Sequence, residues 1–243
     1  MKLGLLGRTL SHSFSRTYFT DKFKKLNLES FTYDNYELDT EADVKVFKSG
    51  DSLNLNGFNV TIPYKETVFN LCDELSPEAK AIGAVNCVKV VDGKWHGYNT
   101  DSIGFLKSIA PFLEPQHNNA LIFGTGGASK AIQYALTSKG IKTFVVGRTS
   151  GDLMLNEIQP VHVEHCKLLV NCTPVGMHPK IDETLPLPFE VMNEDYLAVD
   201  LIYNPEKTQF LQLAEQQSAC IVNGKAMLHF QAEASWDIWN TSK

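Results

Sequence analysis

The sequence has no cysteine pair at metal-binding spacing, no long hydrophobic run and no excess of positive charge. Its five cysteines are scattered singly, which argues against a zinc site or a disulfide framework and fits free thiols in a reducing compartment. No apolar run approaches the ~18 residues that span a bilayer, and the start of the chain is too short and too soon interrupted for a signal peptide. We therefore expect a cytoplasmic protein with no membrane partner.

The charge balance excludes a second class of partner. Lys and Arg number 22 against 28 Asp and Glu, a formal net charge of -6, so no basic field is available to hold a nucleic-acid backbone. Any anionic ligand must be bound by a local site. With 243 residues, 43% of them hydrophobic, the chain can bury two cores, and we start from two domains.

The first hundred residues alternate short apolar runs with helical patterns, which is typical of an α/β sheet. The Ser-rich stretch from Ser11 to Ser15 resembles a helix N-terminus. We expect strands at 3–6, 31–36 and 53–60, helices at 14–26, 41–47, 65–72 and 77–82, and a hairpin of 84–91 with 94–98.

After residue 119 the pattern changes to a regular series of strand, glycine loop, helix and strand. Gly140 is expected to end the helix that follows the glycine loop, and one face of the last helix is expected to carry Met227, Phe230, Gln231, Ala234 and Ile238. The series predicts strands at 120–123, 142–146, 168–172, 197–201 and 219–222, and helices after Gly127, at 206–217 and over the last twenty residues.

The loop Gly124-Thr125-Gly126-Gly127 lies between a predicted strand and a predicted amphipathic helix. A nucleotide pyrophosphate needs backbone N–H groups at close range and a helix N-terminus, and glycine permits that approach. Ser129 stands in the third position of the usual G-x-G-x-x-G pattern, so the alternative is a tight turn that binds nothing. The position after a strand favours nucleotide binding.

The end of the next predicted strand indicates which nucleotide binds. An NAD site usually has Asp or Glu there to bond the ribose hydroxyls. This strand instead ends in Gly147-Arg148-Thr149-Ser150, and a guanidinium with two hydroxyls suits a 2′-phosphate. NADP is therefore the expected cofactor, with a solvated surface arginine as the alternative.

Three stretches of the first domain are polar where a sheet protein is normally apolar or turning. They are Ser13-Phe14-Ser15, Asn59 to Lys65, and Asn86 with Asn99-Thr100-Asp101. Lys65 follows Pro63 at a predicted helix start, where a cation opposes the helix dipole. Such an unfavourable placement is often retained for function, although a snorkelling surface lysine is the alternative.

The polar stretches, the glycine loop and one glutamine form a series of six sequence features along the chain. They are Ser13-x-Ser15, Asn59-Val60-Thr61-x-Pro63-x-Lys65, Gly83-Ala84-Val85-Asn86, Asn99-Thr100-Asp101, Gly124-x-Gly126-Gly127-Ala128, and Gln231 in the last helix. In composition and order they resemble the shikimate dehydrogenase family, over almost the whole chain.

The resemblance implies two α/β domains that meet at a cleft. Residues 1–100 with 223–243 would form the substrate-binding catalytic domain, and residues 101–222 a Rossmann-like NADP-binding domain. The implied activity is the reversible NADPH-dependent reduction of 3-dehydroshikimate to shikimate in the chorismate and aromatic amino acid pathway. The implied state is a monomer or homodimer, with the small-molecule substrate as partner.

The resemblance also implies roles for individual residues. Lys65 and Asp101 would be the acid/base pair, and which of them is the formal base stays open because burial and a neighbouring carboxylate shift the pKa of a lysine in opposite directions. Substrate contacts would come from Ser13, Ser15, Asn59, Thr61, Lys65, Asn86, Asp101, Tyr203 and Gln231. Cofactor contacts would come from Gly124, Gly126, Gly127, Ala128, Arg148, Thr149, Thr173, Gly224 and Met227. Helix capping is the alternative role for one of the two serines, and core packing is the alternative role for Met227.

Some positions depart from the family pattern and leave alternatives open. Gly147 replaces the common Asn before Arg148, and Asp152 lies where a further cation is often found, so a strict preference for NADP over NAD does not follow. His162 and His165 fall on a segment expected to be extended, without a fourth ligand, so no metal is predicted. The rival functions are a quinate/shikimate dehydrogenase that uses NAD and a catalytically silent regulator that binds substrate or nucleotide.

Overall fold

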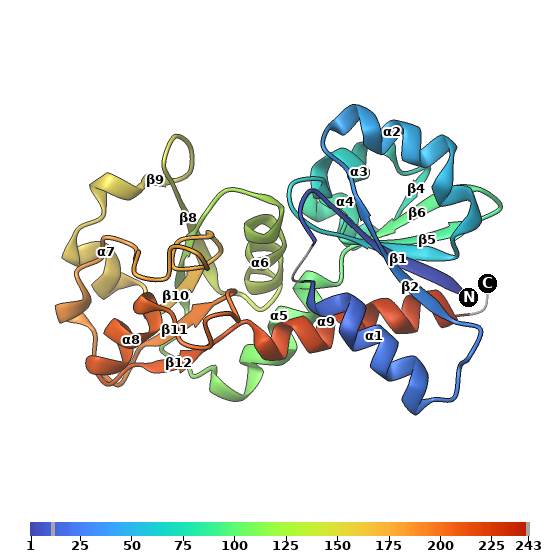
Figure 1. Ribbon diagram of the computed structural model, residues 1–243. Coiled ribbons are helices and arrows are strands. Elements are labelled where there is room, and N and C mark those ends of the chain that lie inside the picture. Colours follow the sequence, from blue (N-terminus) through green and yellow to red (C-terminus); the bar gives the residue numbers. More distant parts are fainter. Residues whose placement is uncertain (11–12, 242–243) are drawn as a thin grey trace. The chain divides into compact units, whose positions relative to one another are not determined.

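The computed structural model describes residues 1–10 and 13–241, so part of the predicted Ser-rich helix start, Ser11 and His12, and the last two residues of the predicted substrate domain lie outside the described residues. The chain forms two compact units, Met1–Thr100 with the chain from Ala232 onward, and Asp101–Gln231 (Figure 1). Each contains one sheet. The predicted α/β fold, with a Rossmann-like second part, is confirmed.

The first unit is built on a six-stranded mixed sheet. Its first three strands are parallel, and a hairpin continues the sheet in antiparallel fashion. The strand order is β2(Thr32–Glu37), β1(Lys2–Gly7), β3(Gly57–Val60), β5(Cys87–Val91), β6(Lys94–Tyr98), β4(Glu74–Leu75). The helices are α1(Phe14–Lys25), α2(Glu41–Ser49), α3(Lys65–Leu71), α4(Pro77–Ile82) and the C-terminal part of α9(Lys225–Asn240).

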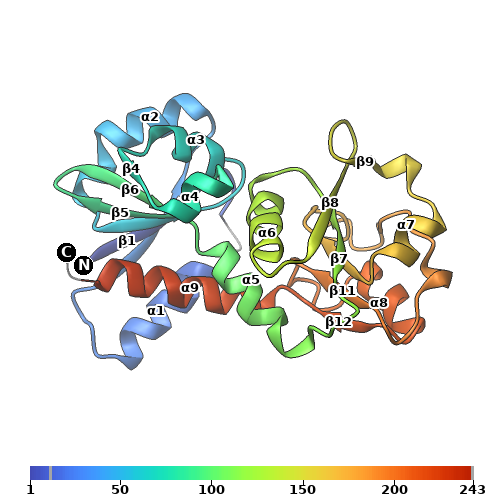
Figure 2. The same cartoon turned by 180° about the vertical axis from the view of Figure 1, so that it is seen from behind.

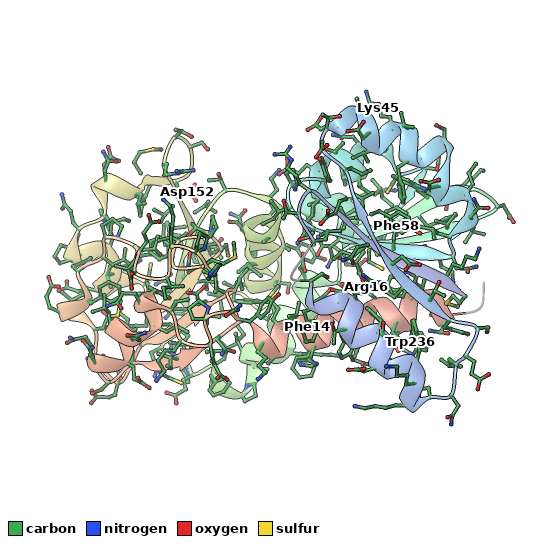
Figure 3. The ribbon with its side chains drawn as sticks, in the orientation of Figure 1. Phe14, Arg16, Lys45, Phe58, Asp152 and Trp236 are labelled. Atoms are coloured by element: carbon green, nitrogen blue, oxygen red, sulfur yellow. The ribbon has the colours of Figure 1, made fainter. Side chains whose placement is uncertain are left out.

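Two hydrophobic clusters cover the two faces of this sheet. On one face Phe58 of β3 packs against Phe47 of α2 and Trp95 of β6, and α3 and α4 complete the cluster (Figure 3). On the other face Phe19 of α1 and Trp239 of α9 pack together. The first and last helices of the chain therefore cover one side of the same sheet.

The second unit has a six-stranded sheet that is parallel throughout (Figure 2). From β7 the chain builds outward through β8 and β9, then returns to β10 on the other side of β7, which is the doubly wound order with its switch point between β7 and β10. The strand order is β12(Cys220–Val222), β11(Leu197–Asp200), β10(Leu168–Asn171), β7(Asn119–Phe123), β8(Lys142–Gly147), β9(Leu153–Met154).

Helices cover both faces of this parallel sheet, as a sheet of this type requires. Side chains from α7 and α8 pack on one face, and side chains from α5, α6 and the start of α9 pack on the other. The bounds are α5(Asp101–Ile109), α6(Gly127–Thr137), α7(Pro160–His165) and α8(Gln209–Gln216).

Local signals set several of these boundaries. The Ser76 side chain accepts a hydrogen bond from Ala79 N at 3.1 Å, Pro77 opens α4, and Gly83 ends it with a φ of 73°. Gly140, with a φ of 77°, follows α6 as predicted. Within residues 1–10 and 13–241, no helix is long and apolar enough to cross a membrane.

Several predicted boundaries are wrong. The first strand of the hairpin, predicted at 84–91, begins only at Cys87. Residues 51–54 form a 3₁₀ turn, and the strand predicted at 53–60 begins only at Gly57, because Ser52 Oγ donates to the Lys48 carbonyl at 2.9 Å and continues the helical winding after α2. The helix predicted at 206–217 begins at Gln209, since the Thr208 side chain accepts from Leu211 N and caps it.

The predicted apolar stripe of the last helix is also wrong in detail. Phe230 is 37% exposed, whereas the buried positions recur every four residues at Met227, Gln231, Ser235 and Trp239. Of these positions, Met227 and Gln231 belong to the predicted face, whereas Ser235 and Trp239 were missed.

The segment with His162 and His165 is helix α7 and not an extended strand. His162 Nδ1 accepts from Gln159 N at 3.1 Å, which closes the first turn of that helix. No cluster of potential metal ligands occurs among the residues that the structure describes.

Candidate functional site

The segment from Asn59 to Lys65 carries polar side chains from the end of β3 to the start of α3. Thr61 N donates to the Leu6 carbonyl at 2.9 Å, so Thr61 lies beside the end of β1. Lys65 is the first residue of α3 and is half-buried, and its carbonyl accepts from Val85 N at 3.0 Å. The lysine at a helix start is thus confirmed as a position, next to the segment that contains Asn86.

Asn59 and Asn86 belong to a buried hydrogen-bond network. Asn59 Oδ1 accepts from the Tyr33 hydroxyl at 2.8 Å, and Asn59 Nδ2 donates to Ser235 Oγ at 2.8 Å and to the Asn86 carbonyl at 3.2 Å. Asn86 Oδ1 accepts from Thr100 N at 2.7 Å, and the hydroxyls of Thr100 and Ser235 lie 3.1 Å apart. The network joins two sheet strands to α9 and fixes both asparagines.

The two serines predicted to contact the substrate, Ser13 and Ser15, have different surroundings. Ser13 precedes α1, but its side chain makes no capping hydrogen bond, so the capping alternative is wrong for Ser13. Its Oγ is buried and has no hydrogen-bond partner among residues 1–10 and 13–241. A buried hydroxyl without a partner costs free energy, and a ligand oxygen would relieve that cost.

Ser15 is buried and hydrogen-bonds to Tyr33. Burial raises the pKa of the Tyr33 hydroxyl well above its ordinary value, and the hydrogen bond from Ser15 offsets part of the effect. Because Tyr33 also donates to Asn59, the hydroxyl of Ser15 is connected to the asparagine network.

Tyr33 and Ser235 were not predicted as site residues. Ser235 had a usable signal, because it stands four residues after Gln231 on α9 and is fully buried. Tyr33 had none, since an aromatic residue in a strand is ordinary.

Asp101 begins α5 and is only 6% exposed. It directly follows Thr100, whose backbone N–H and hydroxyl are held by Asn86 and Ser235. Thr100 ends the first unit and Asp101 begins the second, so Lys65 and Asp101 are described in separate units.

The glycine loop connects β7 to α6 in the second unit. Gly124 has a φ of 114°, and a Cβ there would lie 3.3 Å from both the Cys172 carbonyl and the Thr173 side chain, so the loop lies against the segment after β10. A Cβ at Gly126 would meet nothing within 4 Å, and no side chain caps α6. Gly127 and Ala128 form its first turn, whose N–H groups suit an anion.

The turn after β8 presents Arg148 and Thr149, both of them exposed. A Cβ at Gly147 would overlap the Ser150 carbonyl oxygen, which explains why this chain has glycine there. The Asp152 carboxylate accepts from Val145 N at 2.8 Å, so this acid is bonded to the β8 backbone (Figure 3). Arg148 is the cation that this turn exposes.

The remaining predicted residues follow β11 and β12. Tyr203 is 37% exposed, and burial raises the pKa of its hydroxyl. A Cβ at Gly224 would overlap the Leu201 carbonyl oxygen, so α9 starts in direct contact with the loop after β11. Met227 is buried in the hydrophobic core, as expected for a packing role, and its contact with nicotinamide stays a prediction. Gln231 is buried, and its backbone N–H lies against Gly104 of α5.

Known proteins match this chain over nearly its whole length. The profile of the shikimate dehydrogenase substrate-binding domain matches residues 5–88. A shikimate dehydrogenase (NADP(+)) from Methanopyrus kandleri is 34% identical over 260 residues, covering 98% of this chain and 89% of the relative. The chain belongs to the shikimate dehydrogenase family. The membership predicted from the order of the sequence segments is confirmed.

Two solved structures of family members have the same fold. Shikimate 5-dehydrogenase from Thermus thermophilus, in complex with NADP(H) and shikimate, is 31% identical with a TM-score of 0.85, and the match covers 99% of this chain and 93% of that one. Shikimate 5-dehydrogenase from Listeria monocytogenes, in complex with shikimate and NAD, is 27% identical with a TM-score of 0.84, covering 100% and 92%. Members of the family thus bind either nicotinamide nucleotide.

Proposed function

We propose that this protein is an NADP-dependent shikimate dehydrogenase that reversibly reduces 3-dehydroshikimate to shikimate. The observation that carries the proposal is the match to shikimate dehydrogenases over 98% of the chain. The same chain carries the polar residues of the first unit and the glycine loop of the second. A role in aromatic amino acid biosynthesis, a cytoplasmic location and a monomeric or homodimeric state belong to the same proposal.

The second unit has the features that a dinucleotide requires. The uncapped start of α6 and the side-chain-free Gly126 leave backbone N–H groups for the pyrophosphate. Arg148 and Thr149 are exposed at the end of β8, where the 2′-phosphate of NADP would need them. We propose that Thr173, Gly224 and Met227 contact the cofactor as well.

In the first unit, Ser13 and Ser15 are proposed to bind the substrate carboxylate through their hydroxyls. Thr61, Asn59, Asn86 and Asp101 are proposed to recognise the ring hydroxyls. Because the Asn59 side chain bonds to Tyr33 and Ser235, and the Asn86 side chain bonds to Thr100, the orientation of both asparagines is set before substrate binds. Tyr203 and Gln231 are proposed to complete the substrate contacts.

The proposed chemistry is the transfer of a hydride and a proton. When bound, the nicotinamide accepts the hydride that leaves the carbinol carbon of shikimate. The hydroxyl proton must leave at the same time, and Lys65 paired with Asp101 takes it; in the reverse direction the pair returns the proton to the ketone oxygen. Lys65 is our choice for the residue that exchanges this proton.

The direct test is turnover of shikimate with NADP⁺ or NAD⁺, followed by the absorbance of the reduced cofactor. We expect turnover with NADP⁺, and a higher KM for NAD⁺. Equal kcat/KM values for the two nucleotides would favour the NAD-using alternative, and quinate should be assayed alongside shikimate. No reduced cofactor with either nucleotide would support the silent regulator.

The unpartnered hydroxyl of Ser13 allows a separate prediction. We expect Ser13→Ala to raise the KM for shikimate by about tenfold, the effect of losing one hydrogen bond to a charged group. The free energy of unfolding should not fall and should rise by up to about 1–3 kcal/mol, because the variant removes a buried hydroxyl that makes no hydrogen bond among the described residues.

Steady-state kinetics and urea unfolding of the same variant test this prediction. Ser49→Ala is a suitable control, since the Ser49 hydroxyl is exposed and bonds only to carbonyl groups of its own helix. An unchanged KM for shikimate in Ser13→Ala would remove Ser13 from the substrate site.

A further inference from the structure

Asp200, the last residue of β11, is a completely buried carboxylate in the second unit. Its Oδ2 accepts from the Thr208 hydroxyl at 2.6 Å, and its Oδ1 accepts from Ile202 N at 2.9 Å and from Asn171 Nδ2 at 3.2 Å. Asn171 and Thr208 are themselves completely buried. One carboxylate thus binds the end of β10, the loop after β11 and the start of α8.

The network continues from Asn171 into the loop after β10. Asn171 Oδ1 accepts from Thr173 N at 2.9 Å and from the Thr173 hydroxyl at 2.7 Å, and Asn171 Nδ2 also donates to the Val175 carbonyl at 3.3 Å. Farther along the loop, a Cβ at Gly176 would lie 3.4 Å from Thr208 Cβ. Partners of Asp200 therefore bond to the start of the loop and lie close to its end.

This loop also borders the glycine loop after β7. A Cβ at Gly124 would lie 3.3 Å from the methyl group of Thr173. The carboxyl ends of β7 and β10 form the switch point of a doubly wound sheet, where dinucleotides bind. Asp200 is one strand away and reaches the switch point through Asn171 and Thr173.

Asp200 is an unfavourable residue for the fold alone. Burial raises the pKa of its carboxyl group from its ordinary value to about 6, despite three hydrogen bonds that oppose the shift. Ionisation above that pH therefore costs folding free energy, and this cost disappears as the pH falls toward 4. The charge by itself therefore lowers stability, and what the carboxylate contributes is the set of three hydrogen bonds that it accepts.

We propose that Asp200 is a positioning residue for the bound dinucleotide, because it fixes the loop 172–176, which lies beside the glycine loop, and joins it to the loop 201–208. The inference rests on the proposed function, because it takes the switch point of this unit as the nucleotide site. A carboxylate can accept from all three donors at once, whereas an amide offers only one oxygen. In the asparagine variant the NH₂ group would face the Thr208 hydroxyl. That hydroxyl would then have to donate its hydrogen bond to another acceptor.

The test is Asp200→Asn, measured by titration of NADPH fluorescence and by steady-state kinetics. We expect the Kd for NADPH and the KM for NADP⁺ to rise by about tenfold, the change that corresponds to one charge-assisted hydrogen bond, with a much smaller change in kcat. At pH 8 the Tm of the variant should equal or exceed that of the wild type, and the difference should close as the pH falls toward 4. A purely structural role predicts the opposite, a lower Tm at pH 8.

Asp195→Asn is the matched control, because it removes the same charge from an exposed position just before β11. It should change neither nucleotide binding nor Tm. A second pair of variants probes the donor to Asp200. Thr208→Val removes the hydroxyl and should weaken NADPH binding, whereas Thr208→Ser keeps the hydroxyl and should restore it.

The outcomes separate this inference from the proposed function. Tight NADPH binding by Asp200→Asn, or a lower Tm of that variant at pH 8, would overturn the positioning role and leave the dehydrogenase activity standing. Wild-type protein that binds NADPH but does not oxidise shikimate would overturn the proposed function. The positioning role would then be decided by the Kd for NADPH of Asp200→Asn relative to the wild type. Wild-type protein that binds no nicotinamide nucleotide would overturn both.

Discussion

Replacing Lys65 with alanine should lower kcat for shikimate oxidation by ~10²–10⁴-fold, with a much smaller change in KM. The substitution removes the group proposed to exchange the hydroxyl proton, which acts in the transition state. Binding of the ground-state substrate depends on several other side chains, so KM should change little. Steady-state kinetics at saturating cofactor, with shikimate varied, measures both quantities.

Lys80→Ala is the control for this experiment. Lys80 is an exposed lysine on α4 of the same unit, so the two variants change the net charge equally. Near-wild-type turnover by Lys65→Ala would contradict the assignment of Lys65 and Asp101 as the acid/base pair. Lys65 lies at the first position of α3, where its removal also relieves an unfavourable charge at a helix N-terminus, so the variant should fold normally.

Replacing Arg148 with alanine should raise the KM for NADP⁺ by ~10–100-fold, because a charge-assisted hydrogen bond to phosphate contributes about 1.5–3 kcal/mol. The KM for NAD⁺ should change little, since NAD⁺ lacks the 2′-phosphate. The preference for NADP⁺ should fall by nearly the same factor. Arg148 is the only Lys or Arg in the sequence from Gly147 to Asp152, so no second cation is expected to compensate in this turn.

Kinetics with both nucleotides, for wild type and for Lys139→Ala, provide the comparison. Lys139 is an exposed cation just after α6 in the same unit. If Arg148→Ala loses affinity for both nucleotides equally, Arg148 does not recognise the 2′-phosphate. The NADP assignment would then need another residue.

Local sequence signals predicted much of the fold. The glycine loop, the start of α4 at Pro77 and the end of α6 before Gly140 each depend on backbone preferences of a few adjacent residues. Lys65 at a helix start was predictable in the same way, from Pro63 two residues earlier. These features need no knowledge of distant parts of the chain.

The hydrogen-bond networks could not be predicted in this way. Tyr33 and Asn59 are separated by 26 residues, and Asn59 and Ser235 by 176. The same is true of Asp200, whose partners Asn171 and Thr208 lie 29 and 8 residues away. Its burial and its bonds to Asn171 and Thr208 depend on how three strand and helix ends meet in space, which a pattern along the chain does not contain.

The last helix has a consequence for the order of folding. Trp239 Nε1 donates to the Val88 carbonyl at 2.9 Å, and the Trp239 ring packs with Phe19 on the sheet of the first unit. Domains normally fold in the order of their synthesis, N-terminal first. In this protein the core of the first unit includes side chains from the last dozen residues of the sequence. We therefore expect the part of the chain that is synthesised first to complete its core last.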